Sequence, residues 1–279
     1  PISVKGEGPN IPLGDVFKTS IIAWFVSWKT WWTHYFIHPF KDKDKAYFKD
    51  KESPIYRFAF ALLVVLMFIT MPWLSADYGI TADEVVQKTY GDHLLDWYET
   101  DGKDIEAMTY KDLYNYGGLF DYLAAKTYTT FDEWGWQIDH YDVRHGLNSI
   151  FGAIMMLFIG LVGRLITKSW AGALLSLLFA LLSPRIFGHS MNNPKDIPFA
   201  MAYIFTVYHG ILFCRQLPKP TLRTSIALII GIAAAINIRI GGLLLIAYVA
   251  AFSGITFLPS NNLLSGKYIT LPSLRLSRP

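Results

Sequence analysis

The stretch LRTSIALIIGIAAAINIRIGGLLLIAYVAAFSGITFL, residues 222–258, determines the class of this protein. As one helix, its 37 residues would extend about 55 Å at ~1.5 Å per residue, nearly twice the ~30 Å hydrocarbon core of a bilayer. The helix must therefore break, and Asn237–Gly242 supplies the only polar interruption. We predict two helices, near 223–238 and 240–258.

Four further apolar windows precede this stretch, and we expect each to cross a membrane once. The third of them is short and ends at Ser183-Pro184, where a helix should stop or kink. Together with the two later helices they predict six spans in an all-α, polytopic transmembrane helical bundle. The four windows are 57–76, 147–166, 169–187 and 197–214.

The composition excludes several other classes of protein. Hydrophobic residues make up 52% of the 279 residues and charged residues only 17%, whereas soluble domains carry about a quarter charged residues. Cys214 is the only cysteine, which excludes a disulfide scaffold and indicates a packing role for its side chain. A net charge of +3 is too small to indicate a nucleic-acid partner, so the expected surroundings are membrane lipids.

The distribution of charge predicts the orientation. Nine Lys and Arg residues occur up to and including Arg57, whereas 77–145 holds 15 of the 22 acidic residues and five basic ones. Basic loops face the cytoplasm, so we predict a cytoplasmic N-terminus and a long, helical extracytoplasmic loop over 77–145.

Three parts are expected along the chain. Residues 1–56 form a cytoplasmic tail, with an aromatic interfacial helix over 21–40 and a lysine-rich tether; a poor first transmembrane helix is the alternative for 21–40. Residues 57–258 form the transmembrane core. Residues 259–279 form a C-terminal tail, which we expect to be truncated.

Acidic side chains next to the predicted spans are the first candidates for chemistry. Asp83 and Glu84 follow the first span, and as neighbours on a helix they point about 100° apart, so only one of them can face a given site. Asp196 begins the fourth span, where a carboxylate is costly unless it is paired or functional. Solvation explains the first two equally simply, and helix capping explains Asp196.

Two arginines on the same predicted side complete the candidate site. Arg144 opens the second span and Arg239 lies at the outer end of the fifth. Both could simply extend to the membrane interface, or their guanidinium groups could bind the phosphate of a lipid-linked substrate. A carboxylate could deprotonate an acceptor hydroxyl, and nearby cations could stabilise a departing phosphate. This combination is what glycosyl transfer from a polyprenyl-phosphate sugar requires.

The sequence indicates metal-binding and sugar-binding residues less clearly than it indicates the acids and arginines above. The run Asp139–His145 contains possible metal ligands, but consecutive side chains rarely provide a coordination geometry. No cofactor is certain, and the metal most compatible with the sequence is a divalent cation held loosely by Asp83 or Glu84. The aromatic residues of the loop could stack on sugar rings or pack on one another; they are Trp97, Tyr98, Tyr110, Tyr114, Tyr116, Trp134 and Trp136.

The order of these segments resembles the glycosyltransferase C superfamily, in particular the dolichyl-phosphate-mannose–protein mannosyltransferase-like and aminoarabinose-transferase-like enzymes. The likeness covers about 57–258. It rests on Asp83-Glu84 after the first span, Tyr116–Leu123 in the loop, Arg144 ahead of Leu147–Ala153, Asp196–Phe199, and Gly231–Ala235 ahead of Arg239.

The resemblance implies a role for each candidate. Asp83 would be the catalytic base with Glu84 beside it, and Asp196 a second catalytic acid. Arg144 and Arg239 would bind the substrate phosphate, with a structural role as the alternative for Arg144. The acceptor could be a protein, a lipid or a glycan. Such enzymes continue through further spans, so we expect an N-terminal piece and do not expect full activity from these residues alone.

Two other functions stay open at this point. A transporter would place ionisable residues in mid-membrane and use broken helices, and only the break at Asn237–Gly242 fits that pattern. A non-catalytic membrane scaffold would use the outer loop as an interaction surface. Only the transferase requires Asp83, Asp196 and Arg144 to converge in one cavity.

Overall fold

The structure is a computed structural model that describes residues 54–260, with side chains described as far as 256. The predicted interfacial helix and basic tether, and nearly all of the predicted C-terminal tail, lie outside these residues. Within them every regular element is a helix. In chain order these are α2 (Pro54–Ser75), α3 (Ala82–Glu99), η2 (Glu106–Met108), η3 (Leu113–Asn115), α4 (Leu119–Glu133), α5 (His140–Thr167), α6 (Trp170–Leu181), α7 (Pro184–Asn192), α8 (Asp196–Gln216), α9 (Leu222–Ile238), η4 (Ile240–Gly242) and α10 (Leu243–Ser260).

Three of the described helices, α2, α5 and α8, are long and apolar enough to cross a membrane. The pair α6 and α7 makes a fourth candidate if the two helices form one bent span. The apolar helix α9 is shorter than a usual span, as is the stretch Ile240–Thr256, which holds the part of α10 whose side chains the structure describes. The predicted all-helical class is therefore confirmed for the described residues, with three to four candidate membrane spans rather than six.

Both predicted helix breaks occur. α6 ends at Leu181, Ser183 accepts a hydrogen bond as the N-cap of α7, Pro184 occupies the first turn, and the two helices meet at 68°. Proline suits this position because its missing N–H would have no partner there. Most of the sequence between this break and the fourth predicted span is therefore helix α7.

The second break separates α9 from α10 at Arg239. Its backbone is extended, with φ −154° and ψ 136°, and the turn η4 follows. Gly242 is required there by close approach, since a Cβ atom would lie 2.5 Å from the backbone nitrogen of Ile236. The break thus falls within the polar segment that interrupts the longest apolar run.

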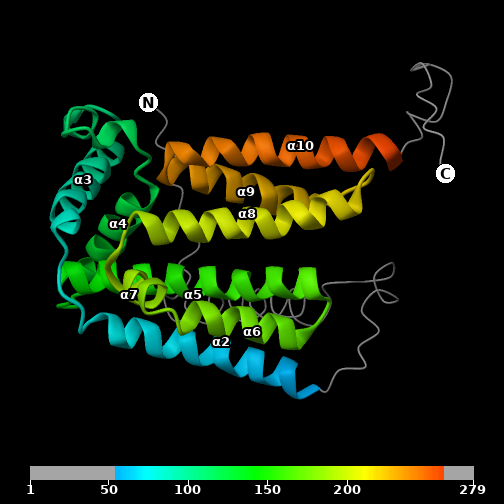
Figure 1. Cartoon of the computed structure of the whole chain (residues 1–279). Coiled ribbons are helices and arrows are strands. Elements are labelled where there is room, and N and C mark those ends of the chain that lie inside the picture. Colours follow the sequence, from blue (N-terminus) through cyan, green and yellow to red (C-terminus); the bar gives the residue numbers. More distant parts are fainter. Residues whose placement is uncertain (1–53, 261–279) are drawn as a thin grey trace, which may run out of the picture. The chain divides into compact units, whose positions relative to one another are not determined.

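α5 is the central helix of the bundle. It packs against α2, α6, α7 and α8, while α8 also packs against α9 and α10 (Figure 1). α3 and α4 pack on each other and lie at one end of the longer helices (Figure 1). The acidic residues of the described chain fall in 77–142 or at Asp196, so we call this end the acidic end.

A glycine on α5 allows the close helix packing. A Cβ atom on Gly160 would lie 2.5 Å from the ring of Phe60 on α2 and 3.2 Å from the carbonyl oxygen of Ala173 on α6. Phe60 is fully buried and its ring contacts Trp170 with centroids 5.5 Å apart, so it has little room to move.

We expect Gly160→Leu to destabilise the protein by about 1–3 kcal/mol, because overpacking forces neighbouring side chains and backbone to shift. The measurement is the thermal unfolding midpoint in detergent. Gly146→Leu on the same helix is the matched control, since a Cβ atom there would meet nothing within 4 Å. Equal midpoints for the two variants would contradict this account of the packing.

Candidate functional site

The first turn of α3 separates the two neighbouring carboxylates. Asp83 is exposed, whereas Glu84 is 1% exposed. Glu84 turns back to accept hydrogen bonds from the backbone N–H and the hydroxyl of Thr81, at 2.7 and 3.0 Å. This fixes the start of α3, where negative charge also interacts favourably with the helix dipole. Of the two candidates, only Asp83 faces solvent.

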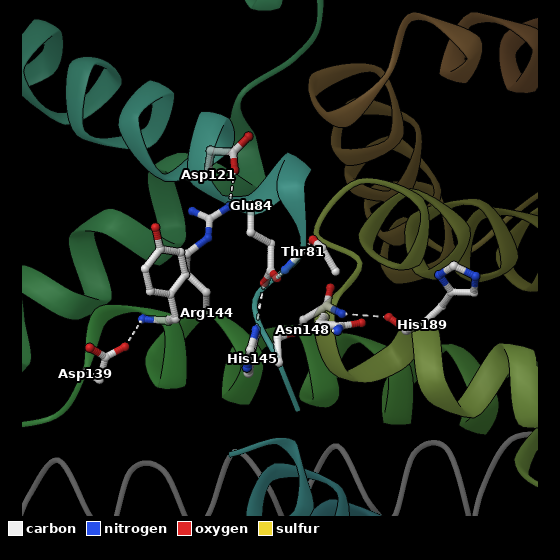
Figure 2. A network of polar contacts seen from close by, with 11 residues as sticks. Thr81, Glu84, Asp121, Asp139, Arg144, His145, Asn148 and His189 are labelled. Atoms are coloured by element: carbon white, nitrogen blue, oxygen red, sulfur yellow. Dashed lines mark hydrogen bonds and ion pairs between the residues drawn. The ribbon is translucent and has the colours of Figure 1, made fainter. Parts of the chain in front are cut away.

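Glu84 also connects α3 to α5. Its Oε1 atom lies 2.8 Å from Nε2 of His145, and both side chains are almost completely buried. Figure 2 shows this contact between the start of α3 and the second turn of α5. The geometry makes Glu84 a group that holds α3 on α5.

A second buried pair joins α4 to α5. Nη2 of Arg144 donates to Oδ1 of Asp121 at 2.6 Å, with side-chain exposures of 1% and 10% (Figure 2). Burial raises the pKa of the Asp121 carboxyl, and the Arg144 guanidinium, followed by the charge of Lys195, opposes that shift. Arg144 therefore lies inside the protein on Asp121 rather than at an open interface.

Further polar atoms are buried around these pairs. Within the part of the chain that the structure describes, both amide atoms of Gln87, Nε and Nη1 of Arg144, and Oδ1 of Asn148 have no hydrogen-bond partner. Gln87 shares the face of α3 that carries Glu84, because residues three apart are neighbours on a helix. Buried polar atoms of this kind are costly and recur at functional sites.

A more exposed polar cluster lies where α8 begins and α9 ends. Asp196 and Arg239 form an ion pair across this boundary, with side chains 58% and 38% exposed. The N-cap position of α8 is Lys195, which makes no side-chain capping bond, and Oδ1 of Asn193 accepts from the backbone N–H groups of Lys195 and Asp196, at 3.3 and 2.9 Å. Asp196 therefore pairs with Arg239 and is not needed as the cap.

Contacts between loops place this cluster at the acidic end. Asn192 donates to the carbonyl oxygen of Gly79 at 2.9 Å, which links α7 to the segment before α3. A Cβ atom on Gly117 would lie 1.9 Å from the carbonyl oxygen of Asn237, so only glycine allows the loop before α4 to approach the end of α9.

The structure accounts for the other sequence candidates in simpler ways. Asp139 is the N-cap of α5 and accepts from the backbone N–H of Tyr141 at 2.8 Å. The described residues contain no group of three His, Cys, Asp or Glu side chains that could hold a metal ion. Several loop aromatics contact one another, for example Trp134 and Trp136 with ring centroids 5.5 Å apart, yet both remain exposed at 63% and 51%.

Sequence reasoning missed the partners of the buried charges. Asp121 was not among the candidates, and His145 was named only within the possible metal-binding run Asp139–His145, although each complements a candidate residue. The available signal was Asp121 itself, a single acid within the apolar run LFDYLAA, because a buried carboxylate needs a partner.

The chain has no match among protein-family models, curated proteins or solved structures.

The Asp121–Arg144 pair makes a quantitative prediction. Removing one partner leaves an unpaired buried charge, so Asp121→Asn should lower the free energy of unfolding by about 3–5 kcal/mol. The double variant Asp121→Asn/Arg144→Met should recover much of that loss, since no unpaired charge remains. Chemical denaturation in mixed micelles provides the measurement.

Lys126→Gln is the matched control for this double-mutant cycle. Lys126 forms an exposed ion pair with Glu99 at 3.0 Å, and exposed pairs contribute little, so this variant should unfold like the wild type. Simple additivity of the two buried substitutions would show that Asp121 and Arg144 are not coupled.

Proposed function

We propose that this protein is an integral membrane glycosyltransferase. It moves a sugar from a polyprenyl-phosphate donor to an acceptor hydroxyl at the extracytoplasmic face of a membrane. In this proposal the acidic end is extracytoplasmic, the N-terminus is cytoplasmic, and α9 and α10 complete six spans with α2, α5, the bent pair α6–α7, and α8. The resemblance to the glycosyltransferase C superfamily belongs to the same proposal.

The observation that carries the proposal is the ion pair between Asp196 and Arg239. Two candidates chosen separately from sequence, 43 positions apart, meet in a partly exposed position at the acidic end. An exposed cation paired with a carboxylate can exchange that partner for a phosphate, which a buried pair cannot do readily. Arg239, with Lys195 beside Asp196 in sequence, is therefore the stronger candidate for binding the donor phosphate.

The reaction assigns one role to each group. Asp83 accepts the proton of the acceptor hydroxyl, whose oxygen attacks the anomeric carbon of the donor sugar. The bond between that carbon and the phosphate oxygen breaks, and polyprenyl phosphate leaves with the electron pair. Arg239 stabilises the charge that develops on the leaving phosphate. Asp196 orients Arg239.

The buried residues have supporting roles in this proposal. Glu84 and Arg144, placed among the site residues by sequence, act as positioning residues that hold α3 and α4 against α5. Their burial supports this assignment, because neither side chain reaches a surface where a substrate could bind. A divalent cation, if used, would be bound by Asp83, the exposed member of the acidic pair.

A transporter is the second candidate. The 68° bend between α6 and α7, and the break between α9 and α10, are of the kind that transporters use to build binding sites. A transporter would move its substrate without cleaving a donor, so the assay below separates the two functions. A scaffold would likewise leave the donor intact.

We expect Asp83→Asn to abolish release of sugar from labelled polyprenyl-phosphate donors by membranes that contain the full-length protein. Asparagine retains the shape of aspartate but cannot accept the proton. Asp77→Asn, in the preceding exposed turn, is the matched control and should retain wild-type release. Undiminished release by Asp83→Asn would exclude Asp83 as the base, and no release by folded wild-type protein with any donor would favour transport or scaffolding.

Arg239 should act mainly on donor binding and leaving-group departure. We expect Arg239→Gln to lower kcat/KM for the donor by about 10²-fold or more, the usual effect of losing one group that stabilises developing charge. Arg239→Lys should recover part of the activity. Arg185→Gln, which removes an exposed charge from α7, is the control and should leave kcat/KM unchanged.

A further inference from the structure

A cavity of about 440 Å³ lies between α8 and α10, away from the polar clusters of the acidic end. Its volume is in the range of sites that hold small molecules. None of the candidate residues of the acidic end lines it. The lining comes from one face of each helix and includes Thr206, Gly210, Cys214, Leu245, Val249 and Phe252.

The cavity has the length of one membrane leaflet. Its lining extends over Thr206–Arg215 on α8 and Leu245–Thr256 on α10. At ~1.5 Å per residue these segments are about 14 and 17 Å long, close to half of the ~30 Å hydrocarbon core. The two helices run in the same direction, so both segments proceed from mid-bundle toward the end opposite the acidic one.

That opposite end is basic. Arg215 is the only charged residue in the lining; it is exposed and donates to the carbonyl oxygen of Leu165 at 3.1 Å. Arg164 and Lys168 close α5 at this end, and Arg223 opens α9. No Asp or Glu occurs in the described ends of α5, α8 and α9 that meet here, and basic side chains attract anions.

We propose that this cavity binds one acyl chain of an anionic phospholipid, with the lipid phosphate at Arg215. The apolar walls match a hydrocarbon chain, the length matches a single leaflet, and the guanidinium lies where the headgroup of that leaflet would be. Two other occupants fit less well. A polyprenyl chain would be longer than the cavity, and another transmembrane helix would not require a cation at the end of the cavity. The inference does not depend on the proposed transferase activity.

The test is photocrosslinking in nanodiscs with phosphatidylglycerol that carries a diazirine near the end of one acyl chain. Labelled peptides should map to 206–215 and 245–256. Phosphatidylcholine with the same chain should label about fivefold less, the effect of one basic side chain at a charged membrane surface. Arg215→Gln should remove this preference, whereas Arg223→Gln, which removes an exposed charge outside the lining, should keep it.

Filling the cavity should prevent labelling of both segments. A Cβ atom on Gly210 would lie 3.8 Å from Val249, so Gly210→Leu fits the backbone and extends into the cavity. Gly254→Leu is the matched control on α10, where nothing lies within 4 Å. Alkylation of Cys214, the only cysteine of the chain, with a bulky maleimide after folding blocks the cavity without relying on refolding.

Three results would overturn the proposal. Labelling that survives both Gly210→Leu and Cys214 alkylation would place the lipid elsewhere. Competition by polyprenyl phosphate but not by phosphatidylglycerol would assign the cavity to a carrier lipid. Disulfide-linked dimers through Cys214 under mild oxidation, with no lipid labelling, would assign this face to a second copy of the chain.

Discussion

Burial of the Arg144 guanidinium is the constraint on which the acidic end of the molecule depends. An arginine that is 1% exposed must be paired and hydrogen-bonded, and Asp121 on α4 provides that partner. Because the pair has one member on α5 and one on α4, it fixes where α4 lies. Gly91 then brings α3 close, since a Cβ atom there would lie 2.6 Å from the carbonyl oxygen of Asp121. Glu84 and His145 add a second buried link between α3 and α5.

In the proposed function, these buried links only position the exposed groups that would react. The buried pairs provide a rigid base, and rigid support is what allows a reactive group to be held in one geometry. Asp83 is exposed to solvent, and Asp196 with Arg239 lies partly exposed where α8 begins and α9 ends. The bundle thus has one end rich in acids and polar pairs and one end that is basic. An asymmetry of this kind is what orients membrane proteins, because basic segments tend to stay on the cytoplasmic side.

Much of the helical framework could be predicted from sequence, because its signals are local. Ser183-Pro184 and Asn237–Gly242 interrupt apolar runs with residues that helices in lipid do not accommodate easily, and both breaks occur. The divergence of Asp83 and Glu84 also followed from helix geometry. The number of spans was less accessible, because α6 and α9 are individually shorter than a bilayer crossing and their membrane role depends on neighbours.

The sequence by itself determined the all-helical membrane class, the positions of the breaks and the segregation of charge, since each depends on composition or on spacing within one helix. Only the tertiary structure decided which charges are buried. Asp121 and Arg144 are 23 positions apart, and Glu84 and His145 are 61 apart. Nothing in the spacing of such residues indicates that they meet. Their pairing follows from the packing of α3 on α4 and of α4 on α5, which depends on contacts throughout the fold.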